Sequence, residues 1–221
     1  MINLKEEIQI VSVLRKKYQL PTTAHLPQIK IDLKRLQDEL DSWILRDKFV
    51  DVITANPTLC MNHKELVKDV YDNFEQINLT DIDGEVMEYT SDVKERIRRR
   101  EERLYNKPTE DYNKSYFKEI VDQFKDSAMR VRITRLAPHQ SISWHIDYDP
   151  SYATRIIIPI FSNDKVENWF RVKGEEINTI LEPGKAYFLN TGFAHAVTNN
   201  GSLPRMALMF SLDGQSDIDD I

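Results

Sequence analysis

The chain has 221 residues, of which 41% are hydrophobic and 30% are charged. This composition is typical of a globular protein and excludes a chain that is disordered throughout. The 30 basic and 36 acidic residues give a net charge of −6, which excludes a protein that binds nucleic acid through its overall charge.

Amphipathic helices are predicted in the first 125 residues, where apolar residues recur three or four positions apart. Asn3 and Asp32 are good capping residues and precede two of these runs. Asn62, with Glu65 three positions later, has the spacing of a capping box. The expected helices cover residues 4–14, 33–43, 63–74, 91–104 and 116–124.

From about residue 128 the pattern changes to short runs rich in Val, Ile, Phe and Tyr, which is typical of β-strands. The runs are separated by turn residues, as in Glu182-Pro183-Gly184, and the connections are too short for a crossover helix. The strands are therefore expected to be antiparallel. Eight of them are predicted, near residues 129–136, 141–147, 154–161, 168–172, 176–181, 185–190, 195–198 and 205–212.

Eight short antiparallel strands in about ninety residues fit a double-sheet jelly roll. The predicted fold class is α+β, with a double-stranded β-helix core of the cupin-like kind and a helical amino-terminal portion. We expect the helical portion to span residues 1–125 and to pack on a jelly-roll core of residues 126–221. Because no linker of low complexity separates the halves, one composite domain is expected rather than two independent ones.

Two histidines and an aspartate form a candidate metal site. His145 and Asp147 lie two positions apart at the end of a predicted strand, so that both side chains point to one face. His195 opens a later strand, where a jelly roll can return the chain beside the first. Two imidazoles and one carboxylate suit divalent iron and leave adjacent coordination positions open. The alternative is a surface pair with a turn-forming aspartate and a hydrogen-bonded strand histidine.

Arg205 is a candidate anion-binding residue. It opens the last predicted strand, ten positions after His195, and a hairpin would bring the two together. A guanidinium inside an apolar strand requires an anionic partner, and a dicarboxylate can supply one through a bidentate pair. The alternative is an arginine at the strand edge, in solvent.

Three stretches and one further residue of the second half resemble the aspartyl/asparaginyl beta-hydroxylase family of Fe(II)- and 2-oxoglutarate-dependent oxygenases. They are Arg132 to Asp147, Thr154 to Ile160, Pro183 to Gly201, and Arg205. The resemblance covers roughly residues 130 to 212. Some animal members of the family lack the acidic ligand. Because this chain has the complete His-x-Asp motif, it is more similar to the microbial members, which include proline hydroxylases.

The resemblance implies a role for each matching residue. His145, Asp147 and His195 would hold Fe(II), and Arg205 would bind the distal carboxylate of 2-oxoglutarate. Further contacts to this cosubstrate are implied for two residues, Arg155 and Thr134.

The function expected from these residues and this resemblance is that of a 2-oxoglutarate-dependent dioxygenase. It would hydroxylate a free amino acid, or an amino-acid side chain in a peptide or protein, and release succinate and CO2. Desaturation and demethylation are other oxidative outcomes that the same site allows. The alternative from another class is a non-catalytic jelly-roll module that binds a small molecule or a protein.

A cytoplasmic location is expected, because the single cysteine, Cys60, forms no internal disulfide and the first residues carry acids rather than a secretory signal. No membrane span is expected. From the resemblance, the expected partner is a small-molecule or peptide substrate. From the net charge, no nucleic-acid partner is expected. The arginine-rich run from Arg96 to Arg103 contains Glu101 and Glu102 and is interpreted as a solvated helix face of mixed charge rather than an RNA-binding stripe.

Overall fold

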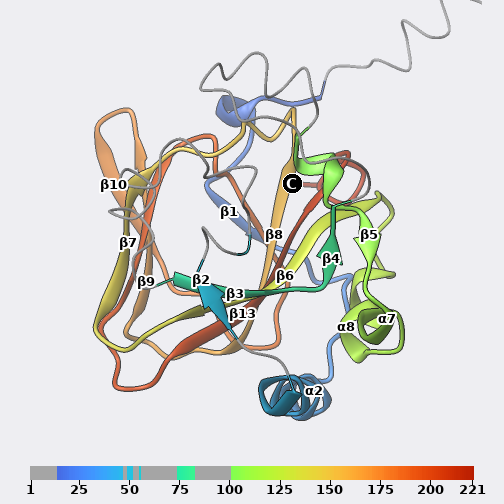
Figure 1. Ribbon diagram of the computed structural model, residues 1–221. Coiled ribbons are helices and arrows are strands. Elements are labelled where there is room, and N and C mark those ends of the chain that lie inside the picture. The colour runs from blue at the N-terminus through green and yellow to red at the C-terminus, as the bar shows by residue number, and fades with distance from the viewer. Residues whose placement is uncertain (1–13, 47–48, 52–54, 56–73, 83–100) are drawn as a thin grey trace, which may run out of the picture.

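The computed structural model of the chain describes residues 14–46, 49–51, 55, 74–82 and 101–221. Within these residues two antiparallel β-sheets face each other, and the helices lie outside them (Figure 1). This arrangement confirms the predicted α+β class with a cupin-like jelly-roll core.

The strands of the two main sheets come from distant parts of the chain. The larger sheet has seven strands in the order β1 (Thr23–His25), β11 (Tyr187–Leu189), β8 (Thr154–Phe161), β13 (Arg205–Leu212), β6 (Ala128–Leu136), β3 (Phe74–Asn78) and β2 (Val50–Asp51). The smaller sheet has four, in the order β10 (Glu175–Thr179), β9 (Val166–Val172), β12 (Ala194–Asn199) and β7 (Gln140–His145). A separate pair is formed by β4 (Thr80–Asp81) and β5 (Lys107–Pro108).

The helical elements in the described part of the chain are short, apart from one. They are the 3-10 turns η1 (Lys17–Gln19) and η2 (Glu101–Leu104) and the α-helices α2 (Leu33–Arg46), α7 (Glu110–Asn113) and α8 (Tyr116–Val121). Asp32 caps α2 as expected, since its Oδ1 accepts a hydrogen bond from Arg35 N at 3.0 Å. None of the helices in the described part of the chain is long and apolar enough to cross a membrane.

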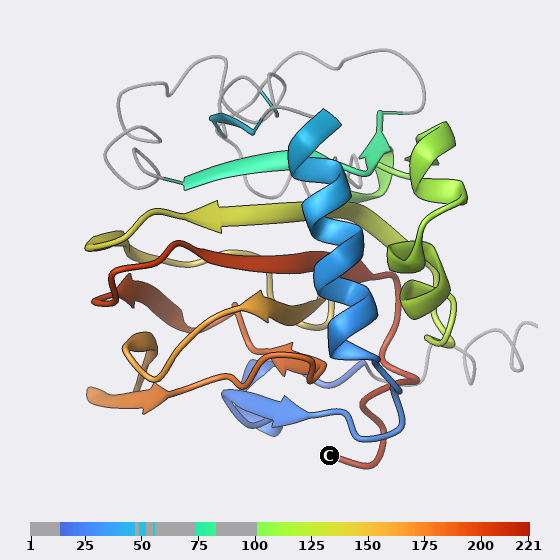
Figure 2. The same cartoon turned by 90° about the horizontal axis from the view of Figure 1, so that it is seen from below.

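The larger sheet is buried on both faces, which explains the unbroken apolar run of β8. Ile156, Ile158 and Ile160 point outward and join Leu36 and Leu40 of α2 in the main hydrophobic core. Figure 2 shows α2 lying across the strands of this sheet. The alternate residues of β8 point the other way, between the two sheets, and these include Arg155. The helices therefore cover one face of the larger sheet and leave the other for a site.

All eight strands predicted in the second half are observed as β6 to β13, with bounds that differ by a few residues at the ends. The helices expected over residues 33–43 and 116–124 are observed as α2 and α8. The helix expected over residues 4–14 lies outside the described residues except at its last position. The same holds for residues 63–73 of the third helix and for residues 91–100 of the fourth.

The prediction for Phe74 is wrong, because this residue begins strand β3 instead of ending a helix. Strand β3 pairs with β6, so that the first half of the chain extends the larger sheet. The sequence of β3 does not alternate in the usual way between apolar and polar residues. Ile77 packs in the core outside the sheet, and Gln76, which points between the sheets, is polar although it is buried. A buried polar residue breaks the apolar period on which strand prediction depends.

Two leucines on α2 offer a matched test of this packing. Leu40 is fully buried in the main core, whereas Leu45 is 87% exposed. We expect Leu40→Ala to lower the free energy of unfolding by about 2–5 kcal/mol, because it removes buried methyl groups and leaves a cavity. Leu45→Ala should change it by less than about 0.5 kcal/mol. Urea unfolding followed by circular dichroism measures both, and equal effects would contradict the packing of α2 on the sheet.

Candidate active site

A β-bulge at the end of β7 turns His145 toward the space between the sheets. His195 of β12 lies opposite His145, and Val197 lies opposite Ile142, so that β7 has one residue more than β12 over this stretch. A bulge of this kind re-aims side chains, which are otherwise bound to strict alternation. Ile142 and His145 therefore line the same cavity although they are three positions apart.

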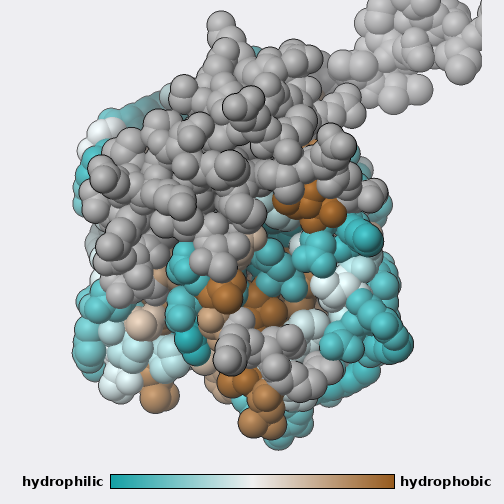
Figure 3. Space-filling view, viewed as in Figure 1, coloured by the Kyte–Doolittle hydropathy of each residue, from teal (hydrophilic) through white to brown (hydrophobic). Residues whose placement is uncertain are grey.

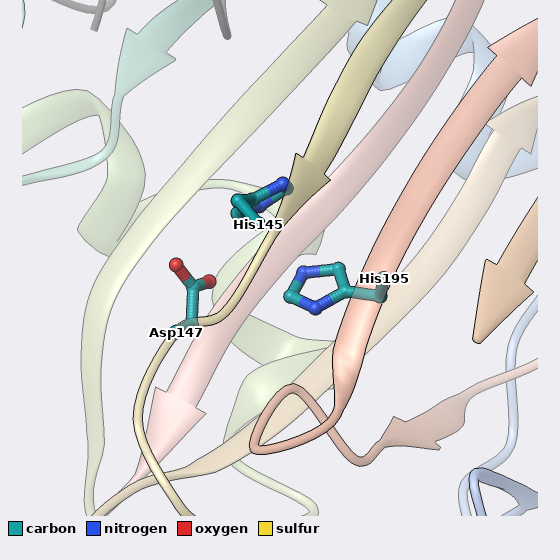
Figure 4. Close-up of side chains that lie close together, drawn as sticks. All are labelled: His145, Asp147 and His195. Carbon is teal, nitrogen blue, oxygen red and sulfur yellow. The ribbon is translucent and has the colours of Figure 1, made fainter. Parts of the chain in front are cut away.

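The structure brings together the three residues predicted to hold a metal (Figure 4). His145 ends β7, Asp147 lies on the loop that follows it, and His195 projects from β12. One potential ligand atom from each residue lies within 4.8 Å of the others, and the two imidazole centroids are 4.2 Å apart. Two nitrogens and one carboxylate oxygen from one side match the ligand set of non-haem iron sites that leave positions open for other ligands.

Backbone carbonyls determine which ring nitrogen of each histidine carries the proton. His145 Nδ1 lies 2.8 Å from Ser143 O, and His195 Nδ1 lies 3.0 Å from Phe193 O. Because a carbonyl only accepts hydrogen bonds, each Nδ1 is assigned the proton and each Nε2 keeps its lone pair. Burial, with the charge of His145 next, lowers the pKa of His195 to about 4, so that this ring is neutral near pH 7.

Asp147 is held in its ionised form. Burial by itself would raise its pKa, but Arg155 first, and then His145 and His195, outweigh burial and hold the pKa well below its usual value. Arg155 Nη2 lies 3.5 Å from Asp147 Oδ2, and Asp147 N donates to Thr191 O at 3.0 Å. An ionised carboxylate is the form that binds a metal.

An amino-terminal segment, residues 15–22, contacts both the loop that carries Asp147 and the loop of residues 190–193, which leads into the strand of His195. Asn190 Nδ2 donates to Lys17 O at 2.9 Å, and Lys17 Nζ donates to Gly192 O at 2.8 Å. Lys17 N also donates to Asp149 Oδ2 at 3.3 Å. A Cβ on Gly192 would lie 3.2 Å from the Cα of Asp149, which is closer than an ordinary contact, so a larger residue here would push the two loops slightly apart.

Arg205 is buried in the cavity that contains the three clustered residues. Its side chain is 3% exposed, and it forms no ion pair with any residue that the structure describes. Burial lowers its pKa to about 10, which leaves the guanidinium charged at neutral pH. A buried cation of this kind requires an anion. In the space-filling view of Figure 3, hydrophobic surface lies in a hollow bordered by hydrophilic residues.

The remaining two predicted residues occupy different positions. Arg155 is 4% exposed and lines the cavity, and its Nη1 has no hydrogen-bond partner among the described residues. Thr134 is fully buried on β6, opposite Ala207, and its Oγ1 donates to Ala207 O at 3.2 Å. Thr134 is not among the residues that line the cavity.

Two buried charged residues near the site were missed in the sequence. Arg132 lines the cavity, and its Nε has no partner among the residues described. Glu102 is 1% exposed and pairs with Arg130, so the interpretation of residues 96–103 as a solvated face is wrong for this residue. The Arg130 charge, followed by Arg155, outweighs burial and lowers the pKa of Glu102 to about 2. Nothing local in the sequence distinguishes Glu102 from its exposed neighbours, since its partners lie 28 and 109 positions away.

Comparison with known proteins gives a family match over the part of the chain that carries the site. The model of a family described as aspartyl/asparaginyl beta-hydroxylase matches residues 101–213. The curated proteins contain no match.

Two solved structures of similar fold come from bacteria. One is an oxidoreductase of the 2OG-Fe(II) oxygenase family from Burkholderia pseudomallei, with a TM-score of 0.44 and 12% identity over 80% of this chain and 79% of that chain. The other is a cupin domain from Bordetella pertussis, with a TM-score of 0.32 and 16% identity over 41% of this chain and 86% of that chain.

Proposed function

The chain belongs to the aspartyl/asparaginyl beta-hydroxylase family, and from this membership and the site geometry we propose that it is an Fe(II)- and 2-oxoglutarate-dependent dioxygenase. Its reaction would hydroxylate an amino acid or an amino-acid side chain and release succinate and CO2. One observation carries the proposal. The His145, Asp147 and His195 cluster shares its cavity with a buried arginine, Arg205, that has no carboxylate partner in the described part of the chain.

The residues of the cluster fit divalent iron. Two imidazoles whose Nδ1 carries the proton and one ionised carboxylate are the donor set that such a metal prefers over softer or all-oxygen sites. His145, Asp147 and His195 would hold the metal. When bound, the metal supplies the oxidative chemistry that couples decarboxylation of 2-oxoglutarate to hydroxylation of the substrate.

The protein's own residues bind and orient the cosubstrate. Arg205 would bind the distal carboxylate of 2-oxoglutarate through a bidentate pair, in an apolar cavity where such a pair is strong. Arg155 would add a second contact through Nη1, for which no hydrogen-bond partner exists among the described residues. The resemblance also implies a contact between Thr134 and the cosubstrate. This contact stays a prediction, since the Thr134 hydroxyl donates its hydrogen bond to Ala207 O instead.

A further cation supports a substrate that carries an acidic group. Arg132 is buried in the same cavity, with Nε unpartnered among the described residues, and burial followed by Arg130 and Arg155 lowers its pKa well below the usual value. Arg132, Arg155 and Arg205 are buried in this region and Arg130 is partly buried, whereas the carboxylates beside them are the buried Glu102 and the partly exposed Asp147. A carboxylate on the substrate would offset part of this excess.

Several other properties remain proposals. We place the protein in the cytoplasm, with a small-molecule amino acid or a peptide as its substrate and no nucleic-acid partner. We also propose that residues 1–125 form a portion packed on a catalytic jelly-roll core of residues 126–221. The strand pairing of β3 with β6 supports a single composite unit.

An anaerobic titration tests the proposed cofactors. Metal-free protein is titrated with Fe(II) alone, with 2-oxoglutarate alone, and with both, while the visible absorption is recorded. We expect a charge-transfer band only when both are present, because it arises from the chelate. Succinate release with candidate amino acids and peptides then identifies the substrate. A folded protein that gives no band would exclude the oxygenase and favour the non-catalytic binding module.

A further inference from the structure

Glu102 is a buried carboxylate to which the site above assigns no function. It lies on the turn η2, outside both main sheets, and its side chain reaches into the charged cluster beside the cavity. Arg130 Nη1 donates to its Oε1, and Ser211 Oγ donates to its Oε2 at 3.1 Å. Both carboxylate oxygens are therefore held in place.

Arg155 lies between this carboxylate and the one in the cluster. Its Nη2 is 3.7 Å from Glu102 Oε1 and 3.5 Å from Asp147 Oδ2. Neither distance is that of a close charge-assisted hydrogen bond, which is about 2.7–2.9 Å. The guanidinium therefore lies near both carboxylates and forms a close hydrogen bond with neither of them.

This shared position matters for the metal. If the guanidinium formed a close hydrogen bond with Asp147, it would compete with a metal ion for the same carboxylate oxygens. If the guanidinium were absent, nothing on this side would orient the Asp147 carboxylate toward the metal. We propose that Glu102 is a positioning residue that holds Arg155 back from Asp147, so that Asp147 stays oriented and available to the metal. This inference rests on the proposed metal site.

A second reading of Glu102 is that it only anchors the turn η2 to the fold. The chain offers a matched control for this reading. Arg103, the next residue on the same turn, pairs with Asp213 and does not reach Arg155. Losing the Arg103 pair loosens the same turn and leaves the contacts between Arg155 and the two carboxylates in place.

The test is a double-mutant cycle read out as metal affinity. Co(II) binding to the metal-free full-length protein is measured by calorimetry and by the visible absorption of the bound ion, for the wild type, Glu102→Gln, Arg155→Gln and the double variant. We expect Glu102→Gln to weaken Co(II) binding about 10- to 100-fold, the range typical of groups that orient metal ligands. In the Arg155→Gln background the same change should have an effect of less than about twofold. Arg103→Gln should leave the affinity within about twofold of the wild type.

Each other result has a definite meaning. Equal weakening in both backgrounds would overturn the proposal, because Glu102 would then act through its charge alone. An equal loss of Co(II) affinity in Arg103→Gln would also overturn the proposal, because Glu102 would then only hold the turn in place. If Glu102→Gln does not fold, Glu102→Asp enters the same cycle, since it keeps the negative charge on the turn and moves the carboxylate away from Arg155. A wild type that binds no Co(II) would count against the proposed metal site itself.

Discussion

Replacing Arg205 with methionine is expected to remove 2-oxoglutarate binding while making the metal-free protein more stable. Truncating one partner of a buried charge pair costs about 2–5 kcal/mol, or roughly 30- to 5,000-fold in affinity. Without an anion, however, the guanidinium is buried with no ion-pair partner among the described residues. An apolar side chain of similar size should raise the free energy of unfolding by about 1–4 kcal/mol.

Calorimetric titration of 2-oxoglutarate into Mn(II)-loaded protein measures the first effect, and urea unfolding of metal-free protein measures the second. Arg135→Met is the control, because Arg135 pairs with Glu75 at 2.6 Å and its side chain is 31% exposed. This control should alter neither quantity by more than about 1 kcal/mol. If Arg205→Met binds 2-oxoglutarate as the wild type does, the distal carboxylate binds elsewhere in the cavity.

Removing the second imidazole of the cluster is expected to abolish iron binding. In His195→Ala only His145 and Asp147 remain, and the loss should exceed the 10- to 100-fold expected for residues that merely orient ligands. We expect no charge-transfer band with Fe(II) and 2-oxoglutarate, and no succinate release.

His139→Asn is the matched histidine control. His139 is exposed on a turn with a φ of 57°, a conformation that asparagine tolerates, and it is not part of the cluster. Its band should equal that of the wild type. A band of unchanged intensity in His195→Ala would mean that the metal binds without this residue.

The strands and the three clustered residues could be predicted because their signals are local. Alternation within each run of the second half indicates a strand, and His145 and Asp147 lie only two positions apart in the chain. Their meeting with His195 followed from the jelly roll, since antiparallel strands with short turns have few ways to pair. The bulge at the end of β7 was not predicted, although it leaves the expected cluster intact.

The charged residues around the cluster could not be predicted, because burial of a charge depends on partners that are distant in sequence. Arg132 and Glu102 belong to residue types that are usually exposed, and only their neighbours in the folded structure distinguish them from exposed arginines and glutamates. Strand β3 was missed for a related reason. Its inward-facing Gln76 is polar and buried beside the same charged region, so the residue pattern does not match either a helix or a half-exposed strand.

The contacts of residues 15–22 also affect how the protein is made. This segment is translated before the loop that it holds through Asn190 and Lys17, which follows 173 residues later in the chain. Contacts so distant in sequence form slowly, since most of the chain must be ordered before they can close. The two loops that this segment contacts are thus expected to be fixed only after the chain has been synthesised beyond Gly192 and has folded. The proposed metal would then be acquired by the folded jelly roll rather than by its separate strands.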